Sequence, residues 1–89
     1  MGVEEALESG SARRRVEALN AVIETDRRDL LPQTIPMLND PNPVVRSSAL
    51  RAVRALTDWR FDYRPYEPEA ARRRLVRDLM RRLDRPDAD

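Results

Sequence analysis

Histidine, cysteine and lysine are all missing from this chain of 89 residues. Their absence excludes zinc fingers, cysteine nucleophiles, serine–histidine–aspartate triads and disulfide bonds. Without lysine, Schiff-base chemistry and phosphate-binding P-loops are excluded as well. Paired carboxylates such as Glu4 and Glu5 lie on a terminal helix with no evident pocket, and surface solvation explains them better than catalysis. We therefore expect no enzyme, and no cofactor, metal ion or small-molecule substrate.

Long apolar runs are missing too. No run approaches the roughly 18 residues that a membrane span requires. The beginning, MGVEEALESG, carries acidic residues where a secretory signal needs basic ones. These features predict a cytoplasmic protein that has no contact with a membrane.

Charge is abundant and unevenly distributed. Hydrophobic residues make up 40% of the chain and charged residues 37%, a profile typical of a small globular domain with a heavily charged surface. Residues 1–45 contain five arginines and eight carboxylates, whereas residues 46–89 contain twelve arginines and eight carboxylates. The first half is therefore acidic and the second half basic, and we expect residues 1–89 to form one domain with a modest core.

Apolar residues recur at helical spacing along most of the chain. The pattern predicts five helices and no strand, over residues 2–8, 11–24, 26–38, 43–56 and 67–83. We expect Asp26 to cap the third helix and Pro36 to kink or loosen its end.

The chain also repeats itself. When Leu7–Thr25 is aligned with Leu38–Leu56, six positions are identical, and one of them pairs Arg15 with Arg46. A second alignment places the last helix on the third one, with Leu75 on Leu30. The second alignment needs a larger offset than the first, and the difference marks an insertion. We therefore divide the chain into a half repeat (1–25, with an incomplete first helix), a whole repeat (26–57), an insert (58–67) and the first half of a further repeat (68–85).

Residues 30–56, LLPQTIPMLNDPNPVVRSSALRAVRAL, resemble a HEAT repeat, including the HEAT-like repeats of bilin lyases. A leucine-rich first helix ends in the turn Leu38–Pro41, and a second helix opens with Val45 and Arg46. The insert is similar to a closing segment of some bacterial HEAT-like proteins. The resemblance implies an all-α fold, a short right-handed α-solenoid of antiparallel helix pairs with about five helices. It also implies a protein–protein interaction or scaffold module.

The resemblance further implies a structural ladder of Arg15, Asp40 and Arg46. In HEAT arrays, an aspartate in the turn and an arginine in the second helix form hydrogen bonds between successive repeats. Arg15 would then reach Asp40, and Arg46 would have Asp84 or Asp87 as its onward partner.

Every aromatic residue lies within positions 58–66, as Trp59, Phe61, Tyr63 and Tyr66. In an extended segment, the alternating Trp59, Phe61 and Tyr63 would point to the same side. Arginines between aromatic residues are also typical of surfaces on which nucleic acid bases stack. We favour an aromatic plug that covers the apolar ends of the helices, with a ligand platform as the alternative.

Two surfaces are candidates for binding. The first is a partner surface on the second helices of the repeats, where we expect exposed apolar residues beside arginines: Val16, Asn20, Ile23, Ser47, Arg51 and Arg54. Its partner would be another protein or a second copy of the chain, as a homo-oligomer. The second is the arginine-rich side of the last helix, an alternative surface for nucleic acid: Arg73, Arg74, Arg77, Arg81 and Arg85.

Overall fold

The computed structural model describes residues 2–64 and 66–84, and this part of the chain contains helices and no strand. The α-helices are α1 (Val3–Leu7), α2 (Ala12–Glu24), α3 (Leu31–Thr34), α4 (Pro43–Leu56) and α5 (Glu69–Asp84). Two short 3-10 helices, η1 (Arg28–Leu30) and η2 (Ile35–Asn39), flank α3. The expected all-α fold is confirmed. No helix in the described ranges is both long enough and apolar enough to cross a membrane.

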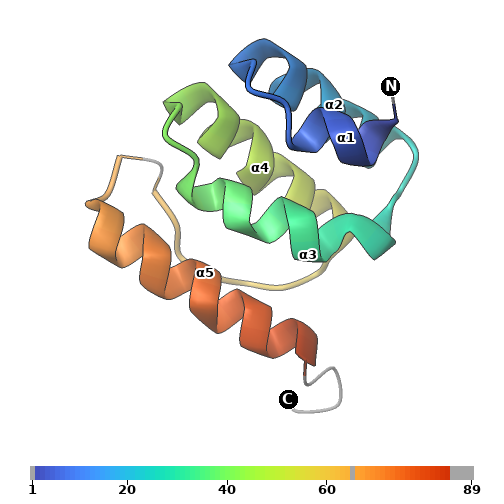
Figure 1. Cartoon of the computed structure of the whole chain (residues 1–89). Coiled ribbons are helices and arrows are strands. Elements are labelled where there is room, and N and C mark those ends of the chain that lie inside the picture. Colours follow the sequence, from blue (N-terminus) through green and yellow to red (C-terminus); the bar gives the residue numbers. More distant parts are fainter. Residues whose placement is uncertain (1, 65, 85–89) are drawn as a thin grey trace.

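The helices form two layers (Figure 1). One layer contains α2 and α4, which pack side by side. The other contains α1, the segment from α3 to η2, and α5, in this order from one end of the molecule to the other. Contacts between layers join α1 to α2 and η2 to α4, while α5 packs on η2. The α1–α2 pair and α5 therefore lie at opposite ends of the molecule.

Local hydrogen bonds fix both ends of α2. The Ser11 hydroxyl accepts a hydrogen bond from the Arg14 amide at 3.4 Å at the beginning of the helix. At its end, the amide of Arg27 donates to the Val22 carbonyl and the amide of Asp26 donates to the Ile23 carbonyl. This is the Schellman pattern, and it requires the left-handed backbone that Asp26 adopts at φ 51°. Asp26 thus terminates α2, and the expectation that it caps the next helix is wrong.

The third predicted helix is broken into three pieces. Pro36 has no amide hydrogen to donate to the carbonyl four residues before it, so a regular α-helix cannot continue through it. The chain takes the tighter 3-10 form from Ile35 to Asn39 instead. Buried Thr34 satisfies one carbonyl at the break, because its hydroxyl donates to the Leu30 carbonyl at 2.8 Å. The loosening expected from Pro36 is therefore present.

The core is built mainly from α2, the α3–η2 segment and α4. Its largest fully buried apolar side chains are Leu19, Leu30, Ile35, Leu38, Val22, Val45 and Val53. In contrast, Leu79 is the one buried side chain of α5. Burial of one such side chain contributes about 1.5–3 kcal/mol, so apolar packing alone holds α5 weakly.

Residues 57–64, which follow α4 and which we call the extended segment, run alongside α5 (Figure 1). Their side chains alternate as expected for extended backbone: Trp59 and Phe61 are half-buried and Tyr63 is buried, whereas Arg60 and Asp62 are exposed. The Tyr63 hydroxyl donates a hydrogen bond of 2.6 Å to the Leu38 carbonyl at the end of η2. This hydrogen bond attaches the segment to the core.

Replacement of Tyr63 by phenylalanine should lower the free energy of unfolding by about 1–2 kcal/mol, because the buried Leu38 carbonyl would lose its donor. Chemical denaturation monitored by Trp59 emission measures this difference. Tyr66→Phe is the matched control, since the side chain of Tyr66 is 80% exposed and its loss of a hydroxyl should leave the unfolding midpoint unchanged. Equal midpoints for the two variants would contradict the role of the Tyr63 hydrogen bond.

The same hydrogen bond predicts a dependence on alkaline pH. Burial raises the pKa of the Tyr63 hydroxyl above its ordinary value of 10.0, and the positive charges of Arg46 and Arg72 offset part of this rise. The unfolded chain therefore loses this proton first, and the stability that Tyr63 contributes falls as the pH rises above about 10. We expect the difference in unfolding free energy between the wild type and Tyr63→Phe to be full at neutral pH and to shrink at alkaline pH.

Candidate interaction surfaces

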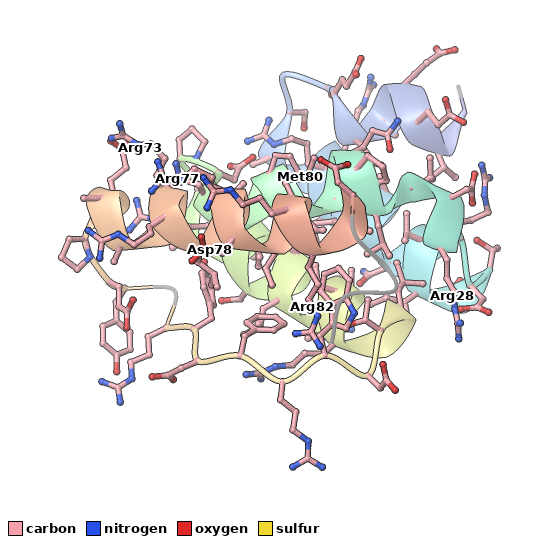
Figure 2. All side chains as sticks on the ribbon, turned by 90° about the horizontal axis from the view of Figure 1, so that it is seen from below. Arg28, Arg73, Arg77, Asp78, Met80 and Arg82 are labelled. Carbon is pink, nitrogen blue, oxygen red and sulfur yellow. The ribbon has the colours of Figure 1, made fainter. Side chains whose placement is uncertain are left out.

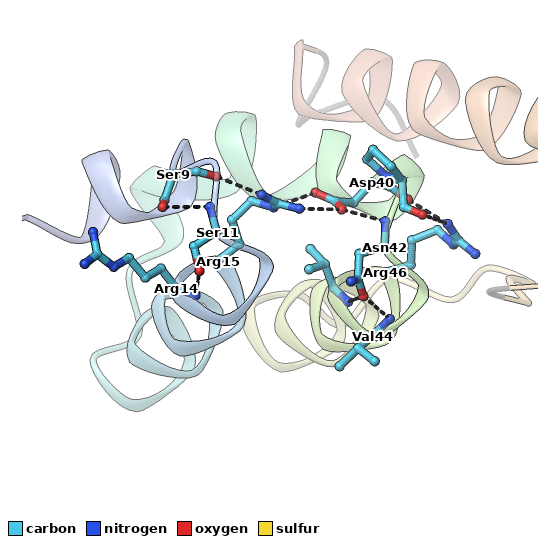
Figure 3. Close-up of polar contacts among 10 residues, drawn as sticks. Ser9, Ser11, Arg14, Arg15, Asp40, Asn42, Val44 and Arg46 are labelled. Carbon is cyan, nitrogen blue, oxygen red and sulfur yellow. Dashed lines mark hydrogen bonds and ion pairs between the residues drawn. The ribbon is translucent and has the colours of Figure 1, made fainter.

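A single turn, Leu38–Pro41, collects hydrogen bonds from several parts of the chain, and we call it the central turn. Arg15 of α2 contacts its Asp40 carboxylate twice, with Nε 2.9 Å from Oδ2 and Nη2 3.1 Å from Oδ1 (Figure 3). The remaining Nη1 of Arg15 donates to the Ser9 carbonyl at 2.8 Å. The Asp40 side chain is only 9% exposed, so this ion pair is largely shielded from water. The structure thus brings together Arg15 of α2 and Asp40 of the turn that ends η2.

The turns before α2 and α4 use the same hydrogen bonds at matching positions of the internal repeat (Figure 3). The Ser9 hydroxyl accepts from the Ser11 amide, as the Asp40 carboxylate accepts from the Asn42 amide. The residues capping the two helices, Ser11 and Asn42, accept from amides three positions later. An arginine in each helix then donates to the carbonyl six residues before it, Arg15 to Ser9 and Arg46 to Asp40. The internal repeat is therefore a repeat of turn geometry as well as of sequence.

Two more arginines, Arg46 and Arg72, donate hydrogen bonds to the central turn. Arg46 Nη1 donates to the carbonyls of Asp40 and Pro41 at 2.7 and 3.2 Å. Asp84 is exposed, and Asp87, the other onward partner proposed for Arg46, lies outside the described residues. Arg72 of α5 donates to Asn39 Oδ1 at 3.0 Å and also to the Glu67 carbonyl. In the sequence, Arg72 stands out because it falls within the apolar arc of the last helix. This position does not predict which groups accept its hydrogen bonds.

The four aromatic residues of positions 58–66 have three different environments. Trp59 and Phe61 pack against the core while half-buried, Tyr63 is 5% exposed, and Tyr66 is 80% exposed. Tyr66 is therefore not part of the plug, because the chain turns towards α5 at this point and carries its ring into solvent. Arg82 lies over the Trp59 ring at 4.9 Å and Arg54 lies over the Phe61 ring at 5.8 Å. These guanidinium groups cover the two rings from α5 and from α4.

The outward side of α2 and α4, which we call the lateral face, contains the six residues of the predicted partner surface. Ser47, Arg51 and Arg54 of α4 are exposed, and Val44 beside them is 62% exposed. Val16 and Ile23 of α2 are half-buried and pack against the core, so the prediction that they stand exposed is wrong. Asn20, which lies between Val16 and Ile23 in the sequence, is also half-buried.

The solvent side of α5, which we call the arginine face, carries Arg73, Arg74, Arg77 and Arg81, all exposed. Figure 2 views the molecule from this end, with Arg73, Arg77 and Arg82 spread along the helix. Arg73 forms an ion pair of 2.7 Å with Glu69. Within residues 2–64 and 66–84, no carboxylate pairs with Arg74, Arg77 or Arg81. Arg85, the fifth arginine of the predicted surface, lies outside the described residues.

The described residues contain no group of three carboxylates that could hold a metal ion. A pocket of about 460 Å³ lies between η1 and the end of α4, lined by Arg28, Leu31, Ala55, Leu56, Thr57, Asp58 and Trp59. Its one carboxylate, Asp58, is exposed, and its arginine is paired with Asp26 at 3.4 Å.

Comparison with known proteins identifies the repeat. Residues 30–59 match the family model of the HEAT repeat. The matched segment begins in η1, includes the central turn and α4, and ends at Trp59. The comparison with curated proteins found no match. The comparison with solved structures found none either. The resemblance of residues 30–56 to a HEAT repeat is thus confirmed.

Removal of the carboxylate at the central turn should be strongly destabilising. Asp40→Ala leaves the shielded Arg15 without its counter-ion and the Asn42 amide without its acceptor, and we expect a loss of about 2–4 kcal/mol. The control is Asp29→Ala, which breaks an exposed pair with Arg27 and should barely change the melting temperature. Thermal unfolding followed by circular dichroism measures both, and an Asp40→Ala melt equal to that of Asp29→Ala would refute the ladder.

Proposed function

We propose that the protein is a HEAT-type module for protein–protein interaction or scaffolding, without catalytic activity. Residues 1–25 form a half repeat, residues 26–57 a whole repeat, residues 58–67 an insert and residues 68–85 the first half of a further repeat. The helix pairs are antiparallel and continue as a short right-handed solenoid. The match of residues 30–59 to the HEAT repeat supports this proposal, since such repeats commonly mediate protein interactions.

The observation that carries the proposal is the composition of the lateral face on α4. This helix contains Arg46, Arg51 and Arg54 but no acidic residue, so its exposed arginines have no carboxylate within their own helix. Exposed Val44 and Ser47 lie on the same side of the helix. An apolar side chain beside arginines is typical of protein interfaces, where arginine is enriched. The partner that fits is a protein with acidic groups around a small apolar patch.

Nucleic acid is the second candidate partner, and the arginine face favours it. Three of its exposed arginines have no carboxylate partner among the described residues, and phosphate contacts come from such clusters. However, the whole chain has a formal net charge of only +1, whereas nucleic-acid-binding domains are usually strongly basic. The protein partner is therefore the better supported of the two.

A photo-reactive amino acid at Ser47 tests the lateral face directly in cells that produce the protein. We expect this probe to cross-link a protein, because Ser47 is exposed beside Arg51. The same probe at Gln33, an exposed residue in the other layer, should cross-link nothing specific. Arg51→Glu/Arg54→Glu should abolish the cross-link from position 47 while circular dichroism shows that the variant is folded.

Two results would count against the proposal. Equal cross-linking from positions 47 and 33, unchanged by the Arg51→Glu/Arg54→Glu substitutions, would show that the lateral face has no partner. A salt-dependent gel shift with duplex DNA that Arg73→Glu/Arg77→Glu abolishes would establish the nucleic acid alternative instead.

A further inference from the structure

The end of the molecule formed by α1 and α2 has an open apolar groove. Its volume is about 380 Å³, and it is lined by Gly2, Val3, Ala6, Arg14, Glu17, Ala18 and Ala21. The helix α1 has only five residues against thirteen in α2, so it covers only part of that helix. Val3, Ala6 and Ala21 remain half-exposed as a result. We call this surface the acidic end, for the charges described next.

Carboxylates outnumber arginines in the part of the chain that forms this end. Residues 2–29 contain seven exposed carboxylates and three exposed arginines. Glu5 and Glu8, on α1 and at its end, are exposed, and no ion pair within the described residues engages either of them. Glu17 lines the groove itself and pairs with Arg13 at 3.3 Å. An approaching surface would therefore meet an apolar groove with a negative rim.

The opposite end, formed by α5, has the complementary character. The helix carries five exposed arginines, on the arginine face and at Arg82, against three exposed carboxylates. Its apolar residues are incompletely covered, because Leu79 alone is buried while Val76, Met80 and Leu83 are half-buried. Figure 2 shows Met80 on the same side of the molecule as Arg77 and Arg73. This basic end presents apolar side chains with a positive rim.

We propose that the basic end of one copy binds the acidic end of a second copy, so that the chain associates head to tail. Helices α1 and α5 belong to the same layer (Figure 1). When α5 of one copy contacts α1 of the next, the layers of the two copies are therefore continuous. Opposite charges align the two ends, and Met80 with its apolar neighbours covers the groove between α1 and α2. The contact joins two different surfaces, so it leaves a free end on each copy and can extend to further copies.

The size of the two ends predicts a weak contact. An end built from α2 and one neighbouring helix spans about 20 Å by about 20 Å, or about 400 Å². This is about half of the roughly 800 Å² that each partner buries in a standard stable interface. Association should therefore have a Kd above about 10 µM, and it should weaken as salt screens the opposite charges.

Sedimentation velocity of the full chain across a range of concentrations tests this proposal. We expect the wild type to shift from monomer towards larger species above about 100 µM at low salt and to return to monomer at about 0.5 M salt. Two charge-reversal variants, Arg77→Glu/Arg81→Glu at the basic end and Glu5→Arg/Glu8→Arg at the acidic end, should each remain monomeric. These four side chains are exposed, so their reversal should leave the fold intact, as circular dichroism can verify.

An equimolar mixture of the two variants provides the decisive measurement. In the mixture, the reversed basic end of one variant faces the reversed acidic end of the other, so association should return. The control Arg51→Glu/Arg54→Glu changes the net charge by the same amount as Arg77→Glu/Arg81→Glu, but on the lateral face. It should associate like the wild type. The lateral face and the two ends are thereby tested separately.

Three results would overturn the head-to-tail contact. The first is a wild type that stays monomeric at all concentrations and low salt. The second is self-association of either reversed variant at the wild-type level. The third is a mixture of folded variants that stays monomeric. Should a reversal unfold the chain, Arg77→Gln/Arg81→Gln and Glu5→Gln/Glu8→Gln replace it, and each of these must weaken association for the proposal to stand.

Discussion

The central turn is the point on which the packing of the whole chain depends. A helix that ends leaves carbonyl groups without partners, and Leu38–Pro41 ends η2 close to the middle of the molecule. Four segments of the chain supply the missing donors or bind the turn's side chains: α2 through Arg15, α4 through Arg46, the extended segment through Tyr63, and α5 through Arg72. These polar contacts fix the positions of elements that apolar packing alone would leave free to slide.

This arrangement makes the stability of the molecule uneven. The α2–α4 layer and the α3–η2 segment contain nearly all of the fully buried side chains, whereas α5 buries Leu79 alone. The attachment of α5 depends on Leu79, on its half-buried neighbours, and on the contacts of Arg72 and Arg82 with Asn39 and Trp59. Elements with few buried apolar contacts open at lower free energy than the rest of a fold. The arginine face is consequently carried by a helix that buries little apolar surface.

Much of this could be predicted from the sequence, because the strongest signals are local and periodic. The spacing of apolar residues defines α2 and α4 to within a residue, and the internal repeat aligns Arg15 with Arg46 before any geometry is known. The contact of Arg15 with Asp40 follows from the family resemblance. In contrast, the left-handed backbone of Asp26 depends on how α2 ends, and a residue that can cap a helix can equally terminate one.

The remaining differences arise from packing between distant segments. The exposure of Val16 and Ile23 depends on how the neighbouring helices pack against α2, and a helical wheel carries no information about those neighbours. Tyr66 has the same chemistry as Tyr63, yet one ring is exposed and the other buried, because the extended segment ends between them. The acceptors of Arg72 are provided by an irregular turn far earlier in the chain, and by a backbone carbonyl.

The exclusive use of arginine has a structural consequence that lysine could not reproduce. Arg15, Arg46 and Arg72 each contact at least two acceptors, and a planar guanidinium with five donors can satisfy them from one position. Arg54 and Arg82 lie over aromatic rings, where the same planar group packs closely. Lysine, as a single ammonium on a flexible stem, would bind one acceptor well and leave others unsatisfied. The arginines within the molecule therefore connect its segments, whereas Arg74, Arg77 and Arg81 of the arginine face have no carboxylate partner among the described residues.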